Sequence, residues 1–194
     1  RVSDASLKSR DLLYQIGQWK SRNISPKQAT RDADTDKEHL AAVAYRRYQD
    51  ELIRCGTVDF DDLLLLTHAL FRDFPNVRDI EAARFDHILV DEYQDTNDIQ
   101  YNIVKSLSQK HRNLCVVGDD DQSIYGFRGS DVRHILNFSE DWHDAKTIRL
   151  EANYRSTEAI LEVSNRLIRF NANRYDKVLK AARRGGQKPR IEQF

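Results

Sequence analysis

The chain has no methionine, only two cysteines, and few prolines or glycines for its 194 residues. Cys55 and Cys115 lie far apart, so they form neither a disulfide framework nor a zinc-binding set, and we expect a reducing, cytoplasmic setting. No apolar run approaches the ~20 residues that cross a bilayer. No signal peptide opens the chain. We therefore do not expect a secreted protein or a membrane protein.

None of the seven glycines is followed by lysine. The phosphate-binding loop Gly-x-x-x-x-Gly-Lys-Ser/Thr is thus absent, and with it the backbone cradle and the lysine for the β- and γ-phosphates of a nucleotide. The chain also begins at Arg1 rather than at a methionine. We interpret it as an internal piece of a longer protein.

Net charge of one sign is missing too, because 31 basic residues balance 31 acidic ones. A strongly basic domain would indicate nucleic-acid binding by itself, so any such contact here must come from a local patch. The 40% hydrophobic content is enough for the core of one domain or one and a half.

A short apolar run, Ile88–Val90, stops abruptly at Asp91 and Glu92. Such a run predicts a buried strand, and acids at its carboxyl end stand where open α/β sheets bind ligands. In a nucleotide-hydrolysing enzyme the first acid would hold Mg²⁺ and the second would orient or deprotonate the attacking water. The alternative is a strand that leaves the core through an acidic turn.

Two further apolar runs also end in polar segments. Leu114–Val117 leads into Gly118–Gly129, which reads Gly-Asp-Asp-Asp-Gln-Ser-Ile-Tyr-Gly-Phe-Arg-Gly, and Thr147–Leu150 leads into Glu-Ala-Asn-Tyr-Arg-Ser at residues 151–156. Strands that alternate with helices predict a parallel sheet. We therefore expect three strands, each followed by a loop suited to phosphate or base binding.

Together, Asp-Glu-Tyr-Gln-Asp-Thr, Gly-Asp-Asp-Asp-Gln-Ser-Ile-Tyr and Asn-Tyr-Arg-Ser resemble the Walker B motif and the two following motifs of superfamily 1 DNA helicases of the UvrD, PcrA and Rep kind. The resemblance is strong over residues 57–170. It implies an α/β fold, namely part of a RecA-like P-loop NTPase motor domain with a three-layer parallel sheet, preceded by an all-helical subdomain. It also implies ATP and Mg²⁺ as cofactors, and single-stranded DNA and single-strand/duplex junctions as partners, beside repair or replication proteins that the sequence does not identify.

The resemblance assigns the nucleotide site residue by residue. Asp91 would hold Mg²⁺, Glu92 would act as base on water, and Gln122 would sense the γ-phosphate. Tyr154 is similar to the residue that stacks on adenine, and Arg155 to the arginine that reaches the γ-phosphate in the transition state. Gln122 could instead be a loop amide that bonds the backbone, and Arg155 part of a helix cap.

Tyr125, Phe127 and Arg128 form the DNA-facing element that the resemblance implies. These helicases usually carry tryptophan where Phe127 stands, so we expect weakened but retained base stacking. A core aromatic in a glycine-flanked loop is the alternative. Arg128 would contact phosphate or bridge to the acidic motif. Asp120 and Asp121 lack the spacing of a calcium loop and are predicted to be turn and surface residues.

The organisation of the chain changes near residue 57. Residues 1–56 have helical spacing and predict a subdomain of two or three helices, with a cap and first-turn proline at Ser25-Pro26; residues 57–182 would be the motor core, and residues 183–194 a linker and the start of a second motor domain. Helices are predicted from Asp59, as N-cap, through Leu70, and at residues 97–109, near 132–138, and at 157–170.

Family members carry the phosphate-binding loop on an earlier segment and an arginine finger on a later domain. We therefore expect this chain alone to be inactive as an ATPase. Two alternatives stay open for the parent protein: a helicase–nuclease subunit of the AddA or RecB kind, and a binding module that retains motor motifs without turnover.

Overall fold

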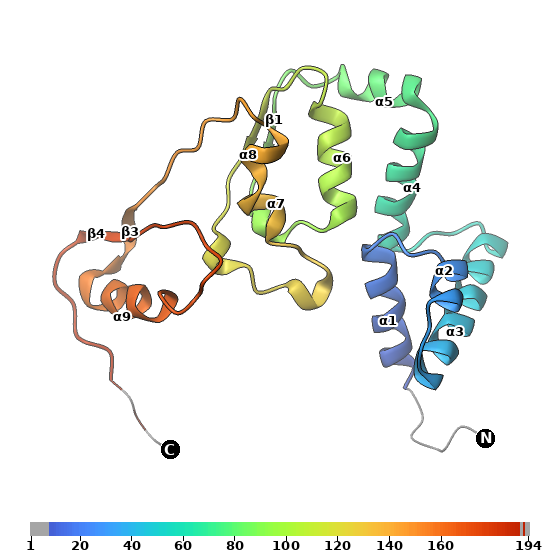
Figure 1. Cartoon of the computed structure of the whole chain (residues 1–194), viewed down its shortest axis with the longest axis horizontal. Helices are drawn as coiled ribbons and strands as arrows, with labels where there is room; N and C mark the ends of the chain where they lie inside the picture. Colours follow the sequence, from blue (N-terminus) through green and yellow to red (C-terminus); the bar gives the residue numbers. More distant parts are fainter. Residues whose placement is uncertain (1–7, 191, 193–194) are drawn as a thin grey trace. The chain divides into compact units, whose positions relative to one another are not determined.

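The computed structural model describes residues 8–190 and 192, and these form two compact units (Figure 1). The first unit holds the described residues up to Asp119 together with Ser123–His134. The second holds Asp120–Gln122 and the described residues from Ile135 onward. Within the described part of the chain, no helix is long and apolar enough to cross a membrane.

Three helices open the first unit: α1 (Ser9–Ser21), α2 (Pro26–Arg31) and α3 (Asp36–Arg54). Capping boxes begin two of them. The Ser25 and Thr35 side chains accept from the N–H groups of Gln28 and Glu38, whose side chains accept in return from the backbone N–H groups of Ser25 and Thr35. The helices enclose a small core of Ile16, Ala29, Ala42 and Tyr45, with Trp19 packed against it. The prediction of two or three helices before residue 57, with Pro26 in a first turn, is confirmed.

A buried lysine joins α1 to the next helix, α4 (Phe60–Asp73). The Lys20 side chain is 0% exposed, and its Nζ lies 2.7 Å from both Asp59 Oδ2 and Asp62 Oδ1. Burial alone would raise the pKa of Asp59, but the hydrogen bond from Lys20 brings it below its ordinary value. Asp59 also accepts from the Asp62 N–H, so the predicted N-cap is confirmed.

Two more helices complete the helical part of the first unit: α5 (Pro75–Ala82) and α6 (Asp98–Ser108). The Asn97 side chain caps α6 by accepting from two backbone N–H groups, as the predicted helix at residues 97–109 requires. Helices α4 and α6 pack side by side (Figure 1).

The strands form two small parallel pairs. In the first unit β1 (Ile88–Val90) pairs with β2 (Leu114–Val116), with Ile88 opposite Leu114. In the second unit β3 (Ala152–Thr157) pairs with β4 (Lys180–Arg183). This mixture of helices and parallel strands is compatible with the predicted α/β class.

The third predicted strand, Thr147–Leu150, is wrong. This segment is not a strand, and Ile148 and Leu150 are 69% and 79% exposed. Strand pairing begins instead at Ala152, where β4 supplies a backbone partner, so the Asn-Tyr-Arg-Ser motif lies within β3 rather than in a loop. The sequence did not predict β4, because Lys-Ala-Ala-Arg has no β-branched or aromatic residue.

Short helices connect these elements: 3₁₀ turns η1 (Tyr93–Asp95), η2 (Asp120–Gln122) and η3 (Gly126–Arg128), and α7 (Arg133–Leu136) and α8 (Phe138–Asp141). The single helix predicted near residues 132–138 is therefore two. The predicted helix at 157–170 is confirmed as α9 (Glu158–Ile168). The strand expected to begin at residues 190–194 falls largely outside the described residues.

Candidate functional site

The two acids after β1 form a tight turn. Glu92 has φ of 50° and ψ of 41°, a left-handed conformation that is uncommon for a residue other than glycine. Its backbone N–H donates to Asp91 Oδ1 at 2.9 Å. Both residues are exposed, so the turn presents two adjacent carboxylates to solvent at the end of the strand.

One buried side chain, Gln94, holds Glu92. Gln94 is 1% exposed, and its Nε2 donates to Glu92 Oε2 at 2.8 Å. Its Oε1 accepts from the Asp119 N–H at 2.9 Å. The amide thus joins the carboxylate after β1 to the backbone after β2. Gln94 was not predicted to have a role, although its place two residues after Glu92 was an available signal.

The segment that follows Glu92 is hydrogen-bonded along its length to the segment that follows β2. The backbone carbonyls of residues 94–96 accept from Ser123 Oγ, Ser130 Oγ and Asp131 N at 3.4, 2.8 and 3.0 Å. Asn97 and Ser130 form a β-bridge. The residues just before and just after the candidate DNA-facing element are therefore both fixed to the acidic motif.

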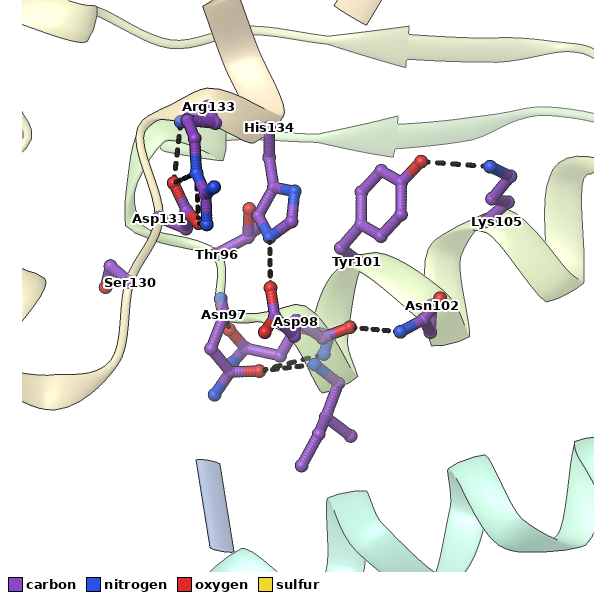
Figure 2. A network of polar contacts seen from close by, with 12 residues as sticks. Thr96, Asn97, Asp98, Tyr101, Asn102, Lys105, Ser130, Asp131, Arg133 and His134 are labelled. Carbon is purple, nitrogen blue, oxygen red and sulfur yellow. Dashed lines mark hydrogen bonds and ion pairs between the residues drawn. The ribbon is translucent and has the colours of Figure 1, made fainter. Parts of the chain in front are cut away.

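Figure 2 shows how this attachment continues at the start of α6. Asp98 Oδ1 lies 3.0 Å from His134 Nε2, and the His134 ring stacks on Tyr101 with centroids 4.4 Å apart. Asp131 accepts from Arg133, which lowers the pKa of the Asp131 carboxyl. Asp98, Asp131 and His134 lie close enough to share a cation, but His134 and Arg133 already engage the two acids.

Tyr125, Phe127 and Arg128 form one exposed cluster in the first unit. The two rings are tilted with centroids 6.0 Å apart, and the Arg128 guanidinium carbon lies 5.5 Å and 5.6 Å from them. Phe127 is 55% exposed, which contradicts the alternative of a core aromatic. Arg128 has no carboxylate partner among the described residues, so the expected bridge to the acidic motif is not formed.

Helix α1 holds the backbone of this cluster. Tyr14 Oη donates to the Phe127 carbonyl at 2.9 Å, and Gln18 Nε2 donates to the same oxygen. Two residues on, Gly129 has φ of 90°, and a Cβ there would collide with Ser21 Oγ. Glycine is therefore required at this close approach. The sequence analysis missed Tyr14 and Gln18, because a bond to a backbone carbonyl requires no particular residue at the acceptor.

Gln122 ends η2 and belongs to the second unit, where it is exposed. Its neighbours Asp120 and Asp121 lie in this 3₁₀ turn, which confirms the predicted turn, but the prediction that they are surface residues is wrong. Asp120 pairs with Lys177 and is 3% exposed, and Asp121 Oδ1 accepts from Arg174 Nε at 2.8 Å. Although burial alone would raise the pKa of Asp121, the hydrogen bonds from Arg174 and Lys177 lower it. These cations come from a distant segment, which local sequence does not reveal.

Tyr154 and Arg155 lie on β3, also in the second unit, and both are exposed. Asn153 Oδ1 accepts from the N–H groups of Arg155 and Ser156 at 3.0 and 2.8 Å. Thr157 is the N-cap residue of α9, so the alternative of Arg155 as part of that cap is not what the structure has. The first unit thus groups Asp91 with Glu92 and Tyr125 with Phe127 and Arg128, while Gln122, Tyr154 and Arg155 belong to the second.

Comparisons with known proteins agree with these motifs. Residues 2–143 match the model of the UvrD/REP helicase N-terminal domain. The ATP-dependent DNA helicase PcrA of Staphylococcus epidermidis is 43% identical over 187 residues, and that of Staphylococcus aureus is 42% identical over 187 residues. Each alignment covers 96% of this chain but 26% of the relative, so the chain spans about a quarter of their length.

Proposed function

Because the chain belongs to the UvrD/REP helicase family, we propose that it is the part of an ATP-dependent DNA helicase that carries the acids for Mg²⁺–ATP and a loop that grips single-stranded DNA. The observation that carries this proposal is the bonded path from Glu92 through Gln94 to the segment that bears Phe127. Residues 57–182 belong to a RecA-like motor core in this proposal, and residues 1–56 to a helical subdomain.

The residues of the acidic turn fit a magnesium nucleotide. Carboxylate oxygens are the ligands that Mg²⁺ prefers, and Asp91 and Glu92 offer them at an exposed strand end. When bound, Mg²⁺ neutralises charge on the phosphate oxygens. Asp91 is the residue that would hold it. Glu92, oriented by the Gln94 amide, accepts a proton from the attacking water.

Three residues of the second unit carry the nucleotide-contacting roles that the helicase motifs imply. Gln122 contacts the γ-phosphate, Tyr154 stacks on the adenine, and Arg155 stabilises charge that develops on the γ-phosphate. Tyr154 and Arg155 are exposed, so their side chains are accessible to a ligand.

The exposed cluster of Tyr125, Phe127 and Arg128 binds single-stranded DNA in this proposal. An exposed aromatic ring offers a stacking surface for any base, and a neighbouring guanidinium attracts the phosphates. A base stacked on Phe127 would be linked through residues 123–130 and Gln94 to Glu92, which gives ATP turnover a route to strand movement. Translocation along single-stranded DNA and opening of duplex at junctions are the activities that this arrangement supports.

A direct test uses the parent protein, with ATP turnover measured with and without oligothymidylate. We expect Mg²⁺-dependent turnover that the oligonucleotide stimulates, and a Phe127→Ala variant that loses most of the stimulation while keeping the DNA-independent rate. Phe85→Ala, at an exposed ring elsewhere in the first unit, is the matched control and should retain stimulation. Strand binding without any ATP turnover would contradict the proposal and favour a binding module.

A further inference from the structure

We propose that Tyr14 and Gln18 of α1 are positioning residues that set Phe127 for contact with a single strand, an inference that rests on the proposed DNA-binding role of this loop. Both side chains donate to one oxygen, the Phe127 carbonyl. Residues four apart on a helix lie on the same face, so α1 meets the loop with a pair of donors.

The contact continues beyond this pair. Ser21, the next residue of that face, lies where Gly129 comes too close for any side chain. Gly126, at the other end of η3, has open space around its Cα. The loop is therefore held against α1 at Phe127 and Gly129 and is uncrowded at Gly126.

The hydrogen bonds to Phe127 do not follow from core packing. Tyr14 is 53% exposed, so burial of its ring does not explain its place. The Phe127 side chain is 55% exposed as well, while its backbone oxygen has two donors. The result is an exposed ring on a fixed backbone, and a preorganised surface binds more tightly because less freedom is lost on binding.

Helix α1 is itself anchored firmly enough to act as a support. Lys20, two residues after Gln18, is fully buried between Asp59 and Asp62 at the start of α4. Helix α1, which positions Phe127, is therefore bound to the start of α4 through one face and meets the loop through another. A shift of α1 would move Phe127 through its carbonyl.

The experiment measures binding of a fluorescent oligothymidylate to the parent protein. The variants are Tyr14→Phe, Gln18→Leu and the double variant. The matched control is Gln109→Leu, at the exposed glutamine that follows the last residue of α6. Each single variant leaves one donor on the oxygen, so we expect less than about twofold weaker binding. The double variant leaves the carbonyl without either donor, and we expect about 3- to 10-fold weaker binding, because a less firmly positioned ring stacks less well on a base.

A spectroscopic signal separates positioning from general stability. In a Phe127→Trp background, oligothymidylate should quench the fluorescence of the new tryptophan, and the double variant should reduce that quenching at saturating DNA. Wild-type affinity and quenching in the double variant would overturn this inference but not the proposed function, whatever the melting temperature of the variant. If Phe127→Ala also binds the strand as wild type does, the proposed function of the loop fails, and this inference with it.

Discussion

Gln94 offers the sharpest test of how the acidic turn works, because its two amide atoms can be altered separately. Gln94→Glu keeps an oxygen for the Asp119 N–H but places a carboxylate 2.8 Å from Glu92 Oε2, where the wild type has a donor. A hydrogen bond to a charged group contributes ~1.5–3 kcal/mol. If that energy orients the base, its loss lowers kcat by about 10- to 150-fold.

Gln94→Leu removes both bonds and leaves the Asp119 N–H without its acceptor. That loss should lower the free energy of unfolding by a further ~1–3 kcal/mol. The assay is steady-state ATP turnover in the parent protein, beside thermal unfolding and binding of a fluorescent nucleotide. We expect Gln94→Glu to lower kcat while nucleotide binding stays near wild type, and Gln94→Leu to lower kcat and the melting temperature. A wild-type kcat in Gln94→Glu would refute the orienting role.

Four other predictions concern the stability of the protein, ATP turnover by this chain alone, and DNA binding. Lys20→Met leaves Asp59 and Asp62 without their buried cation and should lower the free energy of unfolding by ~3–5 kcal/mol, as measured with urea. An unchanged urea midpoint would contradict this. The pKa of Asp59 is lowered on folding, so ionised Asp59 should stabilise the protein fully above the unfolded pKa of about 3.9. This stabilisation should be lost as the pH falls through the folded pKa, which urea unfolding midpoints measured between neutral and acid pH can follow. The 194-residue chain alone, without a phosphate-binding loop, should show no DNA-stimulated phosphate release, and robust release would count against the assignment. Phe127→Trp enlarges the stacking surface and should tighten oligothymidylate binding in an anisotropy titration, whereas weaker binding would speak against stacking.

The elements that local pattern governs could be predicted from the sequence. Asp59 and Asn97 are capping residues followed by helical periodicity, and α4 and α6 begin where these residues indicate. Ile88–Val90 is a strand, as its short apolar run ending at acids predicts, but the predicted burial is wrong, because Leu89 is 76% exposed. In these places local propensity or capping is enough to define the element.

The elements that depend on distant partners could not be predicted from the sequence. A strand at Lys180–Arg183 exists because β3 offers a backbone to pair with, not because of its own residues. The side chains of Asp120 and Asp121 are largely covered because Lys177 and Arg174 pair with them. Charge spacing along the chain carries no trace of such pairs.

The candidate site divides in the same way. Motif residues such as Glu92 could be singled out from their neighbours in sequence, and their catalytic roles stay predictions. Tyr14 could not be found, because it acts through a backbone carbonyl far away in sequence. Gln94 lies only two residues from the Glu92 carboxylate that it holds, but its second bond, to the Asp119 N–H, joins a distant backbone group. A backbone carbonyl or N–H is present at every position, so its partner leaves no recognisable pattern.

The most direct test of the central claim, that Glu92 is the base of an ATP-driven DNA motor, is turnover by a Glu92→Gln variant of the parent protein. With Mg²⁺–ATP and oligothymidylate present, we expect turnover to fall by roughly 10²-fold or more while nucleotide binding stays largely intact. Glu140→Gln, at an exposed acid of α8, should keep full turnover. Equal losses of binding and turnover in Glu92→Gln would contradict the claim and make Glu92 a metal-holding or structural residue.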